Sequence, residues 1–168
     1  LSVIASSSHH LLNLINDILD ISKIESGNLT LVSDPFALPV VIESIIAIIM
    51  PLCKAKKQEL SMELLHIEHE YLLGDRTKVS QVLINLLNNA SKFTPDGGKV
   101  KLTVEELPSA DPDKATYCIA VTDNGIGISK EKQESIFDVF VRGRDSEVSK
   151  IEGTGLGLSI AKKLIQAM

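Results

Sequence analysis

The feature that most limits the possible folds is a pair of stretches rich in β-branched residues, KVKLTVEEL at 99–107 and TYCIAVTD at 116–123. Such stretches predict strands, and the polar loop between them favours antiparallel pairing. Helical patterns lie on both sides of the pair. In a chain of 168 residues this mixture predicts an α+β fold, a two-layer sandwich of one mixed sheet and one helical layer.

The N-terminal segment is expected to be a separate helix. Its apolar residues between Ile4 and Ile24 recur with the heptad spacing of a helical bundle, and Gly27 with Asn28 supplies a stop signal. A single helix cannot bury such a stripe, so either the rest of the chain or a partner helix must cover it. We place the domain boundary near residue 33, which gives segments 1–33 and 34–168.

The remaining elements follow from periodicity and capping residues. Pro51 is expected to kink or break the helix in which it lies, and Phe137 and Phe140 are expected to pack into the core. The predicted elements are a helix at 38–58, a strand at 60–65, a helix at 76–93 capped by Asp75 or Thr77, a helix at 129–140 capped by Ser129, and a helix at 157–168.

Composition argues against several functions. A formal net charge of −5 and the lack of a basic run disfavour a nucleic-acid partner. Cys53 and Cys118 are far apart and lack metal-ligand spacing, which predicts buried free thiols in a reducing compartment. The best candidate for a membrane span, residues 40–50, is interrupted by Glu43 and is too short, so no membrane segment and no signal peptide are expected.

The first stretch that carries chemistry is QVLINLLNNASKFTPDGG at 81–98. On a helical wheel Asn85, Asn89 and Lys92 lie within about 60° of one another, opposite an apolar face. Amide oxygens suit Mg²⁺, and a lysine ammonium suits phosphate. The alternative is that this polar face only contacts water. Three asparagines within five residues favour a function, because asparagine is a mediocre helix former.

Two glycine-rich stretches follow. In VTDNGIGIS at 121–129, Asp123 ends a strand, and the glycines at 125 and 127 let backbone approach a ligand, although an ordinary turn has the same composition. In EGTGLGLSIAKKL at 152–164, three alternate glycines precede a helix whose N-terminal amides favour phosphate. This stretch lacks the GKS or GKT of a Walker A loop, and a flexible hinge is its alternative. The polar run at 142–152 predicts a lid.

In this order, NLLNNASKFT, DNGIGI, FDVF and GTGLGL resemble the N box, first glycine box, F box and second glycine box of the ATP-binding domain of sensor histidine kinases. The wider superfamily includes type II topoisomerase subunits, mismatch-repair ATPases and a heat-shock chaperone. The resemblance covers nearly the whole chain. It implies the Bergerat-type ATP-binding fold, with ATP between the helical layer and the lid and with Mg²⁺ as a cofactor.

The resemblance also implies roles for individual residues. Asp123 would recognise the adenine amine, Asn89 would ligate Mg²⁺, Asn85 would assist at the metal and the phosphates, and Lys92 would contact phosphate. Asn85 and Lys92 are thus the catalytic candidates. The implied nucleotide-binding set is Asn85, Asn89, Lys92, Asp123, Gly125, Gly127, Thr154, Gly155, Leu156, Gly157 and Leu158.

Asn85 stands where hydrolytic members of the superfamily typically carry a glutamate that activates water. An amide cannot act as a general base, so transfer of the γ-phosphate of ATP to a protein is favoured over hydrolysis. Two alternatives remain open. One is a nucleotide-responsive interaction module without kinase activity. The other is a protein serine kinase of the anti-sigma type, which normally lacks a long helix such as that at residues 1–26.

The acceptor motif of such a kinase resembles His-Glu-x-x-x-Pro. His9 and His10 do not match it, because neither is followed by an acid and the next proline is Pro35. Residues 10–27 instead resemble the second helix of the dimerisation hairpin. The chain is therefore expected to be an internal fragment that lacks the acceptor helix and the final strands, and that does not phosphorylate itself. The implied partners are a second copy through residues 1–26 and a response-regulator receiver domain, at a cytoplasmic location whose anchoring to the inner membrane stays open.

Overall fold

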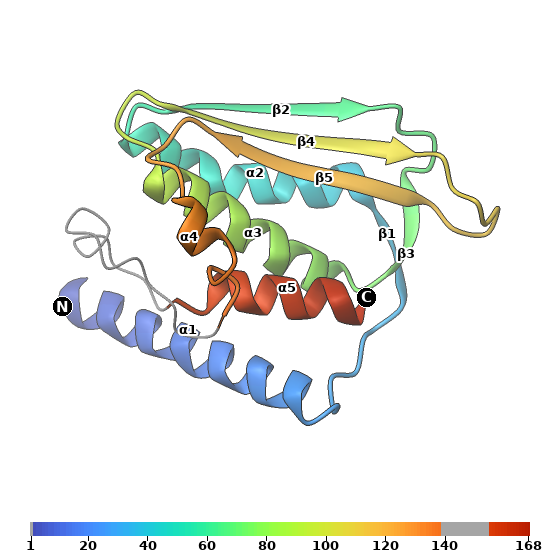
Figure 1. The fold of residues 1–168 in the computed structure, drawn as a ribbon, viewed down its shortest axis with the longest axis horizontal. Coiled ribbons are helices and arrows are strands. Elements are labelled where there is room, and N and C mark those ends of the chain that lie inside the picture. Colours follow the sequence, from blue (N-terminus) through green and yellow to red (C-terminus); the bar gives the residue numbers. More distant parts are fainter. Residues whose placement is uncertain (1, 139–154) are drawn as a thin grey trace. The chain divides into compact units, whose positions relative to one another are not determined.

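Helices and strands are mixed along the computed structural model, which describes residues 2–138 and 155–168 without the side chains of residues 2–10, 13, 14 and 17 (Figure 1). The chain divides into two compact units, each described by itself: unit 1 with Leu1–Leu31 and Ser129–Met168, and unit 2 with Val32–Ile128. The elements are α1 (Ser2–Glu25), β1 (Asp34–Ala37), α2 (Leu38–Ala55), β2 (Glu59–Leu65), β3 (Tyr71–Gly74), α3 (Arg76–Phe93), β4 (Lys99–Leu107), β5 (Thr116–Asp123), α4 (Lys130–Gln133) and α5 (Gly157–Ala167).

The predicted strand pair is confirmed and forms the centre of unit 2. β4 pairs antiparallel with β5, where Leu102 lies opposite Val121, and parallel with β2, where Leu102 lies opposite Met62. Val100, Leu102 and Val104 alternate along β4 and are fully buried, as expected for a strand with one face on a core. The mixed sheet and the flanking helices confirm the predicted α+β class.

A second, two-stranded sheet is absent from the sequence-based prediction. β1 pairs antiparallel with β3, and Pro35 lies opposite Leu73. Each strand has four residues, so neither is long enough to show a clear alternation of apolar and polar residues. This small sheet joins the start of unit 2 to the segment that leads into α3.

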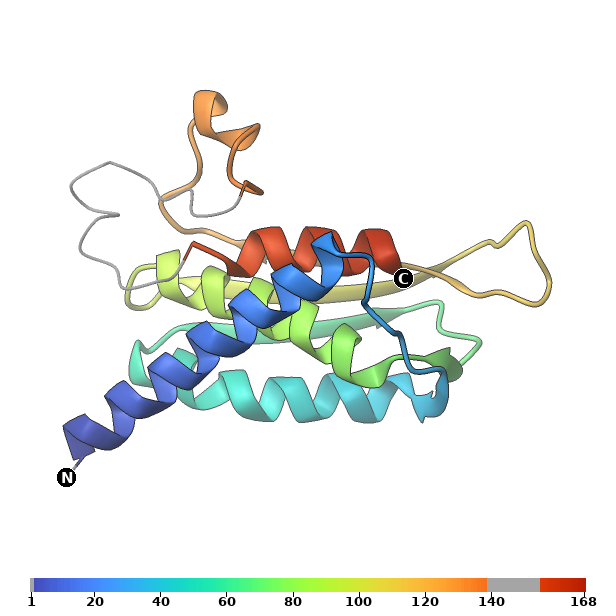
Figure 2. The same ribbon diagram turned by 90° about the horizontal axis from the view of Figure 1, so that it is seen from below.

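Helices α2 and α3 lie side by side on one face of the three-stranded sheet (Figures 1 and 2). Burying one Leu, Ile or Val side chain contributes about 1.5–3 kcal/mol, so the shared core holds both helices against the sheet. The core comprises Leu38, Val41, Ile42, Ile45, Ile49, Cys53, Leu83, Leu87, Ala90, Val100, Leu102 and Val104.

Helix α2 is apolar on its exposed side as well. By length and apolar composition it is the one helix among the described residues that would be able to cross a membrane, with a mean hydropathy of 2.0 and 33% of its residues buried. The apolar stretch is thus longer than residues 40–50, but the buried residues of α2 belong to the core of unit 2, so the expected absence of a membrane segment stays a prediction. The helix continues through Pro51, which does not break it, and ends at Ala55.

The start of α3 is set by Asp75, one of the two predicted caps. Its Oδ1 accepts a hydrogen bond from the Lys78 amide at 3.0 Å, and its Oδ2 accepts one from the Val32 amide at 3.1 Å. Burial raises the pKa of this carboxyl, but the backbone hydrogen bonds outweigh burial and leave the pKa below its usual value. The cap therefore fixes the helix start and also ties down the beginning of unit 2.

In unit 1, α1 ends as its sequence predicts. Gly27 has a φ of 69°, its amide donates to the Ile24 carbonyl at 3.1 Å, and the Asn28 amide donates to the Lys23 carbonyl at 2.9 Å. This is the hydrogen-bond pattern of a Schellman cap. α1 and α5 lie side by side, and Lys163 Nζ lies 2.5 Å from a carboxylate oxygen of Glu25.

The helix predicted at 129–140 is wrong over much of its length. α4 ends at Gln133, and residues 134–138 form turns with hydrogen bonds such as that from the Asp138 amide to the Ser135 carbonyl at 3.0 Å. A helix this short is not stable without a packed apolar face. Phe137 is 38% exposed instead of buried in the core, and Phe140 lies outside the described residues.

The two cysteines differ in their surroundings. Cys53 is a buried free thiol, as predicted, whereas Cys118 is an exposed free thiol, so that part of the prediction is wrong. Side chains alternate along β5, and Cys118 lies between the half-buried Tyr117 and Ile119. It therefore projects from the sheet face opposite the helices.

Candidate functional site

The polar face of α3 is the first part of the candidate site. Asn85, Asn89 and Lys92 are each half-buried, while Leu83 and Leu87 on the opposite side are buried in the core. The ammonium of Lys92 also lies 4.9 Å from the ring centroid of Phe93. The structure thus presents two amides and one ammonium along a single side of a helix whose other side is fixed by packing.

The turn after β5 is the second part. Asp123, the last residue of β5, is exposed, and its Oδ1 accepts a hydrogen bond from the Gly125 amide at 2.9 Å. The next residue is held to β4, because Asn124 Oδ1 accepts from the Lys99 amide at 2.6 Å. One oxygen of Asp123 is therefore oriented by backbone, and a carboxylate has a second oxygen that can accept from an exocyclic amine.

Glycines in this turn are required by geometry. A Cβ at Gly125 would lie 2.5 Å from the carbonyl oxygen of Phe93, so the two backbones meet at a distance that no side chain permits. Gly127 has a φ of +69°, in the left-handed region that favours glycine. The Ile126 amide donates to the same Phe93 carbonyl at 3.3 Å. The end of α3 and the turn after β5 are thus joined directly.

The second glycine-rich stretch belongs to unit 1. Gly155 has a φ of 73°, and α5 begins at Gly157. The buried Leu156 accepts hydrogen bonds at its carbonyl from the Ile160 amide at 2.9 Å and from the Ser159 hydroxyl at 2.8 Å. Leu158 is half-buried in the first turn. The predicted glycine-led helix start is confirmed, whereas Gly153, Thr154 and the predicted lid at 142–152 lie outside the described residues.

The amide side chains on the polar face of α3 suit Mg²⁺ better than a metal ion that is held entirely by protein side chains. Among residues 2–138 and 155–168, no three His, Cys, Asp or Glu side chains gather where they would hold a metal ion. Mg²⁺ keeps several water ligands and takes few protein ligands beside phosphate oxygens. Asn89, with Asn85 one turn earlier on α3, carries an amide oxygen, which is a type of ligand that Mg²⁺ accepts.

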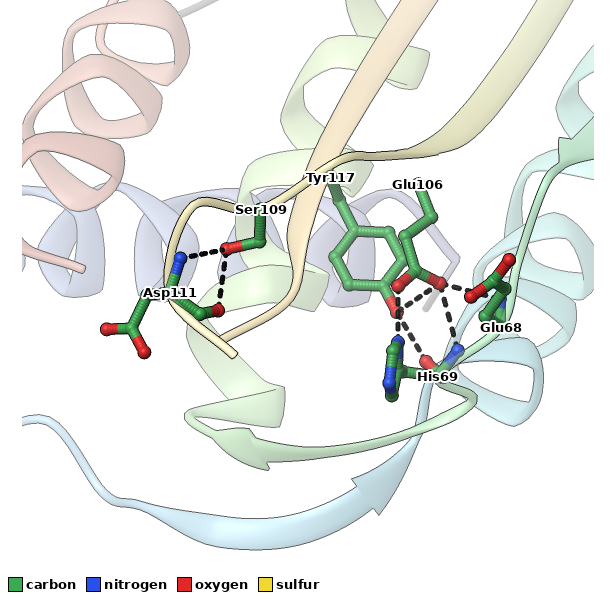
Figure 3. Close-up of polar contacts among 6 residues, drawn as sticks. All are labelled: Glu68, His69, Glu106, Ser109, Asp111 and Tyr117. Atoms are coloured by element: carbon green, nitrogen blue, oxygen red, sulfur yellow. Dashed lines mark hydrogen bonds and ion pairs between the residues drawn. The ribbon is translucent and has the colours of Figure 1, made fainter. Parts of the chain in front are cut away.

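A separate polar cluster lies at the other end of the sheet, where β4 ends and β5 begins (Figures 1 and 3). Glu106 accepts hydrogen bonds from the amides of Glu68 at 2.6 Å and His69 at 2.9 Å, and its Oε1 lies 2.5 Å from Nδ1 of His69. The Tyr117 hydroxyl donates to the His69 carbonyl. The cluster fastens the loop between β2 and β3 to the sheet and contains none of the predicted site residues.

Electrostatics in this cluster are dominated by the contact between His69 and Glu106. The hydrogen bonds from the His69 side chain and amide lower the pKa of Glu106 to about 2, and the same side-chain contact raises the pKa of His69 above its usual value. Burial, together with the nearby Glu106 charge, raises the pKa of Tyr117 to about 12. The phenol therefore stays protonated and serves as a donor, which indicates a structural role.

Comparison with known proteins decides the family. The family model described as "Histidine kinase-, DNA gyrase B-, and HSP90-like ATPase" matches residues 74–168, more than half of the chain. The chain belongs to this ATPase family. The matched residues begin at the last residue of β3 and include α3, the turn after β5 and the start of α5.

Relatives of this ATPase domain are sensor kinases. The autoinducer 2 sensor kinase/phosphatase LuxQ of Vibrio parahaemolyticus is 34% identical over 168 residues, which are 100% of this chain and 20% of that protein. The sensor histidine kinase GacS of Pseudomonas protegens is 38% identical over 168 residues, 100% of this chain and 18% of that protein. The chain thus spans about a fifth of the length of these curated relatives.

Solved structures with a similar fold include histidine kinases. Full-length ShkA in complex with AMPPNP has a TM-score of 0.78 and 27% identity, covering 99% of this chain and 33% of that one. The histidine kinase ThkA in complex with the response regulator TrrA has a TM-score of 0.67 and 26% identity, covering 95% of this chain and 42% of that one. The predicted resemblance to sensor histidine kinases is therefore confirmed.

Proposed function

We propose that this ATPase domain binds ATP with Mg²⁺ and transfers the γ-phosphate to a histidine that lies outside the chain. The observation that carries the proposal is the junction at Phe93, where the polar face of α3 meets the turn that orients Asp123. Two motifs that are far apart in sequence are brought together there by backbone contact. A site for a nucleotide with both a purine amine and phosphates needs these two chemistries side by side.

In the proposed site each residue acts through the atoms it presents. Asp123 accepts a hydrogen bond from the adenine amine through the carboxylate oxygen that the Gly125 amide does not orient. Asn89, assisted by Asn85, holds Mg²⁺, which when bound neutralises charge on the phosphates. Lys92 contacts phosphate as a point charge. The resemblance to sensor histidine kinases further assigns the backbone at Gly155, Leu156, Gly157 and Leu158, with Thr154 beside it, to the triphosphate.

Asn85 and Lys92 are the proposed catalytic residues, and their chemistry favours transfer over hydrolysis. Neither the amide nor the ammonium is a general base for water. Phosphoryl transfer relies mainly on positioning and on electrostatic stabilisation of the phosphates, which these side chains supply. The acceptor in a sensor histidine kinase is a histidine, from which the phosphate passes to an aspartate of a receiver domain. The complex of ThkA with TrrA supports that partner class.

A second copy of the chain is the proposed partner of α1. Five of its apolar side chains are 44% to 58% exposed, namely Leu11, Leu12, Ile15, Ile18 and Leu19. These positions overlap the heptad stripe, which a parallel or antiparallel partner helix would bury. We further propose that the domain works in the cytoplasm, where ATP and receiver domains are available.

The test separates the proposed kinase from its two alternatives. The chain is titrated with AMPPNP with and without Mg²⁺, and is then incubated with γ-labelled ATP alone and with the histidine-bearing hairpin supplied separately. We expect Mg²⁺-dependent binding, no label on the chain itself, and acid-labile label on the hairpin. Acid-stable label would indicate a serine kinase, binding without any transfer of label would indicate a nucleotide-responsive interaction module, and no binding would overturn the proposed function. Acid-labile label on His9 or His10 would contradict the proposed acceptor.

A further inference from the structure

The end of α3 contains carbonyl groups that the helix itself cannot satisfy, as at the end of any helix. The Thr94 amide donates to the carbonyl of Ala90 at 3.0 Å, and the Ile126 amide donates to that of Phe93 at 3.3 Å. The carbonyls of the two residues between them need donors from another part of the fold. A buried carbonyl without a donor would cost about 1–3 kcal/mol.

Lys56, in the turn after α2, supplies those donors. Its Nζ lies 2.8 Å from the carbonyl oxygen of Ser91, 3.1 Å from that of Lys92 and 2.5 Å from that of Thr94. An ammonium has three protons, so these three acceptors use its full donor capacity. Its positive charge also complements the negative end of the helix dipole. Lys56 thus holds the last turn of α3 in a fixed position by binding its free carbonyl groups.

Gln58 also binds carbonyl groups at the end of α3, and its side chain is buried, with 7% exposed. Its Nε2 donates to the carbonyls of Ser91 at 2.8 Å and Thr94 at 2.7 Å, and its Oε1 accepts from the Ser91 hydroxyl at 2.8 Å. A buried amide with both ends satisfied specifies a single geometry, because displacement leaves a polar group unpaired. We name these two residues the Lys56–Gln58 clamp.

The clamped segment carries the proposed nucleotide site. Asn89 and Lys92 project from the last two turns of α3, and Phe93 meets the backbone of Gly125 directly after Asp123. Figure 1 shows that the carboxyl ends of α2, α3 and β5 all lie at the same end of unit 2. A shift in the end of α3 would therefore move the phosphate-binding side chains and the adenine-binding turn together.

We infer that Lys56 and Gln58 are positioning residues of the nucleotide site, although both lie outside the four motifs. They act through the carbonyls of Ser91, Lys92 and Thr94 and touch no part of the nucleotide. This inference rests on the proposed function, because it assumes that Asn89, Lys92 and Asp123 bind ATP with Mg²⁺. Its consequence is that the turn after α2 governs nucleotide affinity from a distance.

The test uses three variants of the whole chain. Lys56→Met keeps the aliphatic stem and removes the donors, Lys56→Arg keeps charge and donors, and Lys54→Met is the matched control at an exposed lysine in the last turn of α2. Each is titrated with Mg²⁺ and AMPPNP by calorimetry at a temperature at which circular dichroism shows it fully folded. Amide NMR signals of Asn89 and Gly125 are followed without nucleotide.

We expect Lys56→Met to bind about tenfold more weakly, a loss that corresponds to about 1.4 kcal/mol of binding free energy. Lys54→Met should retain the original affinity, and Lys56→Arg should recover most of it. The NMR signals should move in Lys56→Met only. Unchanged affinity in folded Lys56→Met would overturn the inference alone, whereas no binding by the unmutated chain would overturn the proposed function. If Lys56→Met does not fold, Gln58→Met replaces it with the same two outcomes.

Discussion

Gly125 approaches Phe93 so closely that a Cβ at position 125 would lie 2.5 Å from the Phe93 carbonyl oxygen and 2.9 Å from its carbonyl carbon. Both groups are backbone, so neither can move aside as a flexible side chain would. We expect Gly125→Ala to displace the turn that follows Asp123 and to destabilise the domain by about 1–3 kcal/mol. We also expect nucleotide binding to weaken by about tenfold, which is about 1.4 kcal/mol of binding free energy. Calorimetric titration with AMPPNP checks the affinity.

Gly97→Ala is the matched control for that substitution. Gly97 has a φ of +76°, but a Cβ there would meet no atom within 4 Å. Alanine at this position should cost about 1 kcal/mol through backbone strain and leave the affinity unchanged. Equal effects of the two alanines on nucleotide binding would show that close approach at Gly125 does not shape the site.

Replacement of Thr94 is expected to stabilise the fold. It is 1% exposed, and within the described residues its hydroxyl is a buried side-chain oxygen without a hydrogen-bond partner. Thr94→Val removes that polar atom and keeps the shape, so we expect the free energy of unfolding to rise by about 1 kcal/mol. Urea denaturation measures it. Thr122→Val, at an exposed position of β5, should change stability by less than about 0.5 kcal/mol. A clear loss of stability in Thr94→Val would mean that the hydroxyl is satisfied.

Lys57 has a φ of 53°, a conformation that residues with a Cβ rarely adopt. Lys57→Gly relieves this strain at the cost of a more flexible unfolded chain, so we expect a net stabilisation of about 0.5 kcal/mol. Lys57→Ala retains the Cβ and should give no such gain. Urea denaturation midpoints of the original chain, Lys57→Gly and Lys57→Ala measure the difference in stability. A glycine variant that is less stable than the alanine variant would show that the backbone at Lys57 is not strained.

The contact between His69 and Glu106 predicts a pH window of added stability. Glu106 has a lowered pKa, so its contribution is present above the ordinary value of 4.5 and is lost as the pH falls toward about 2. His69 has a raised pKa, so its contribution is complete below the ordinary value of 6.5 and is lost as the pH rises through the raised pKa. Both pKa shifts arise from the same hydrogen bond between His69 and Glu106, so this contact stabilises the fold most between about pH 4.5 and 6.5.

We expect the melting temperature of His69→Gln to fall below that of the original chain most clearly inside this window, and the difference to shrink on both sides of it. The charge of Glu68 acts in the same direction on His69 and does not change the sign. His66→Gln, at an exposed histidine of the same loop, is the control. A difference between His69→Gln and the original chain that is constant across the pH range would contradict the contact.

Local signals were enough to predict much of the fold. Asp75 is a strong N-cap residue, and the apolar period that follows it ends at Phe93, so the bounds of α3 agree with the structure. β4 and β5 were predicted from their many β-branched residues and the polar loop between them, and each runs for eight or more residues in the structure. The pairing of β1 with β3 joins two strands of four residues each, and no local pattern identifies such a pair.

The sequence did not reveal the two residues that hold the end of α3, because they bind mainly its backbone carbonyl groups. Lys56 and Gln58 bind carbonyl oxygens, whose positions depend on how α2, α3 and β2 pack and which no pattern of side chains encodes. Phe137 shows the converse case. An aromatic residue at helical spacing suggested core packing, but the chain leaves the helix at Gln133 and the ring is left partly exposed.

The affinity of Asp123→Asn for AMPPNP with Mg²⁺ tests the proposed nucleotide site most directly. The Gly125 amide would hold the amide oxygen of an asparagine, so its NH₂ group would face the adenine amine as donor against donor. We expect this variant, and Asn89→Ala, to remain folded and to lose measurable binding in calorimetry, while Asn88→Ala binds as the original chain does. Unchanged affinity in both Asp123→Asn and Asn89→Ala would contradict the proposed site.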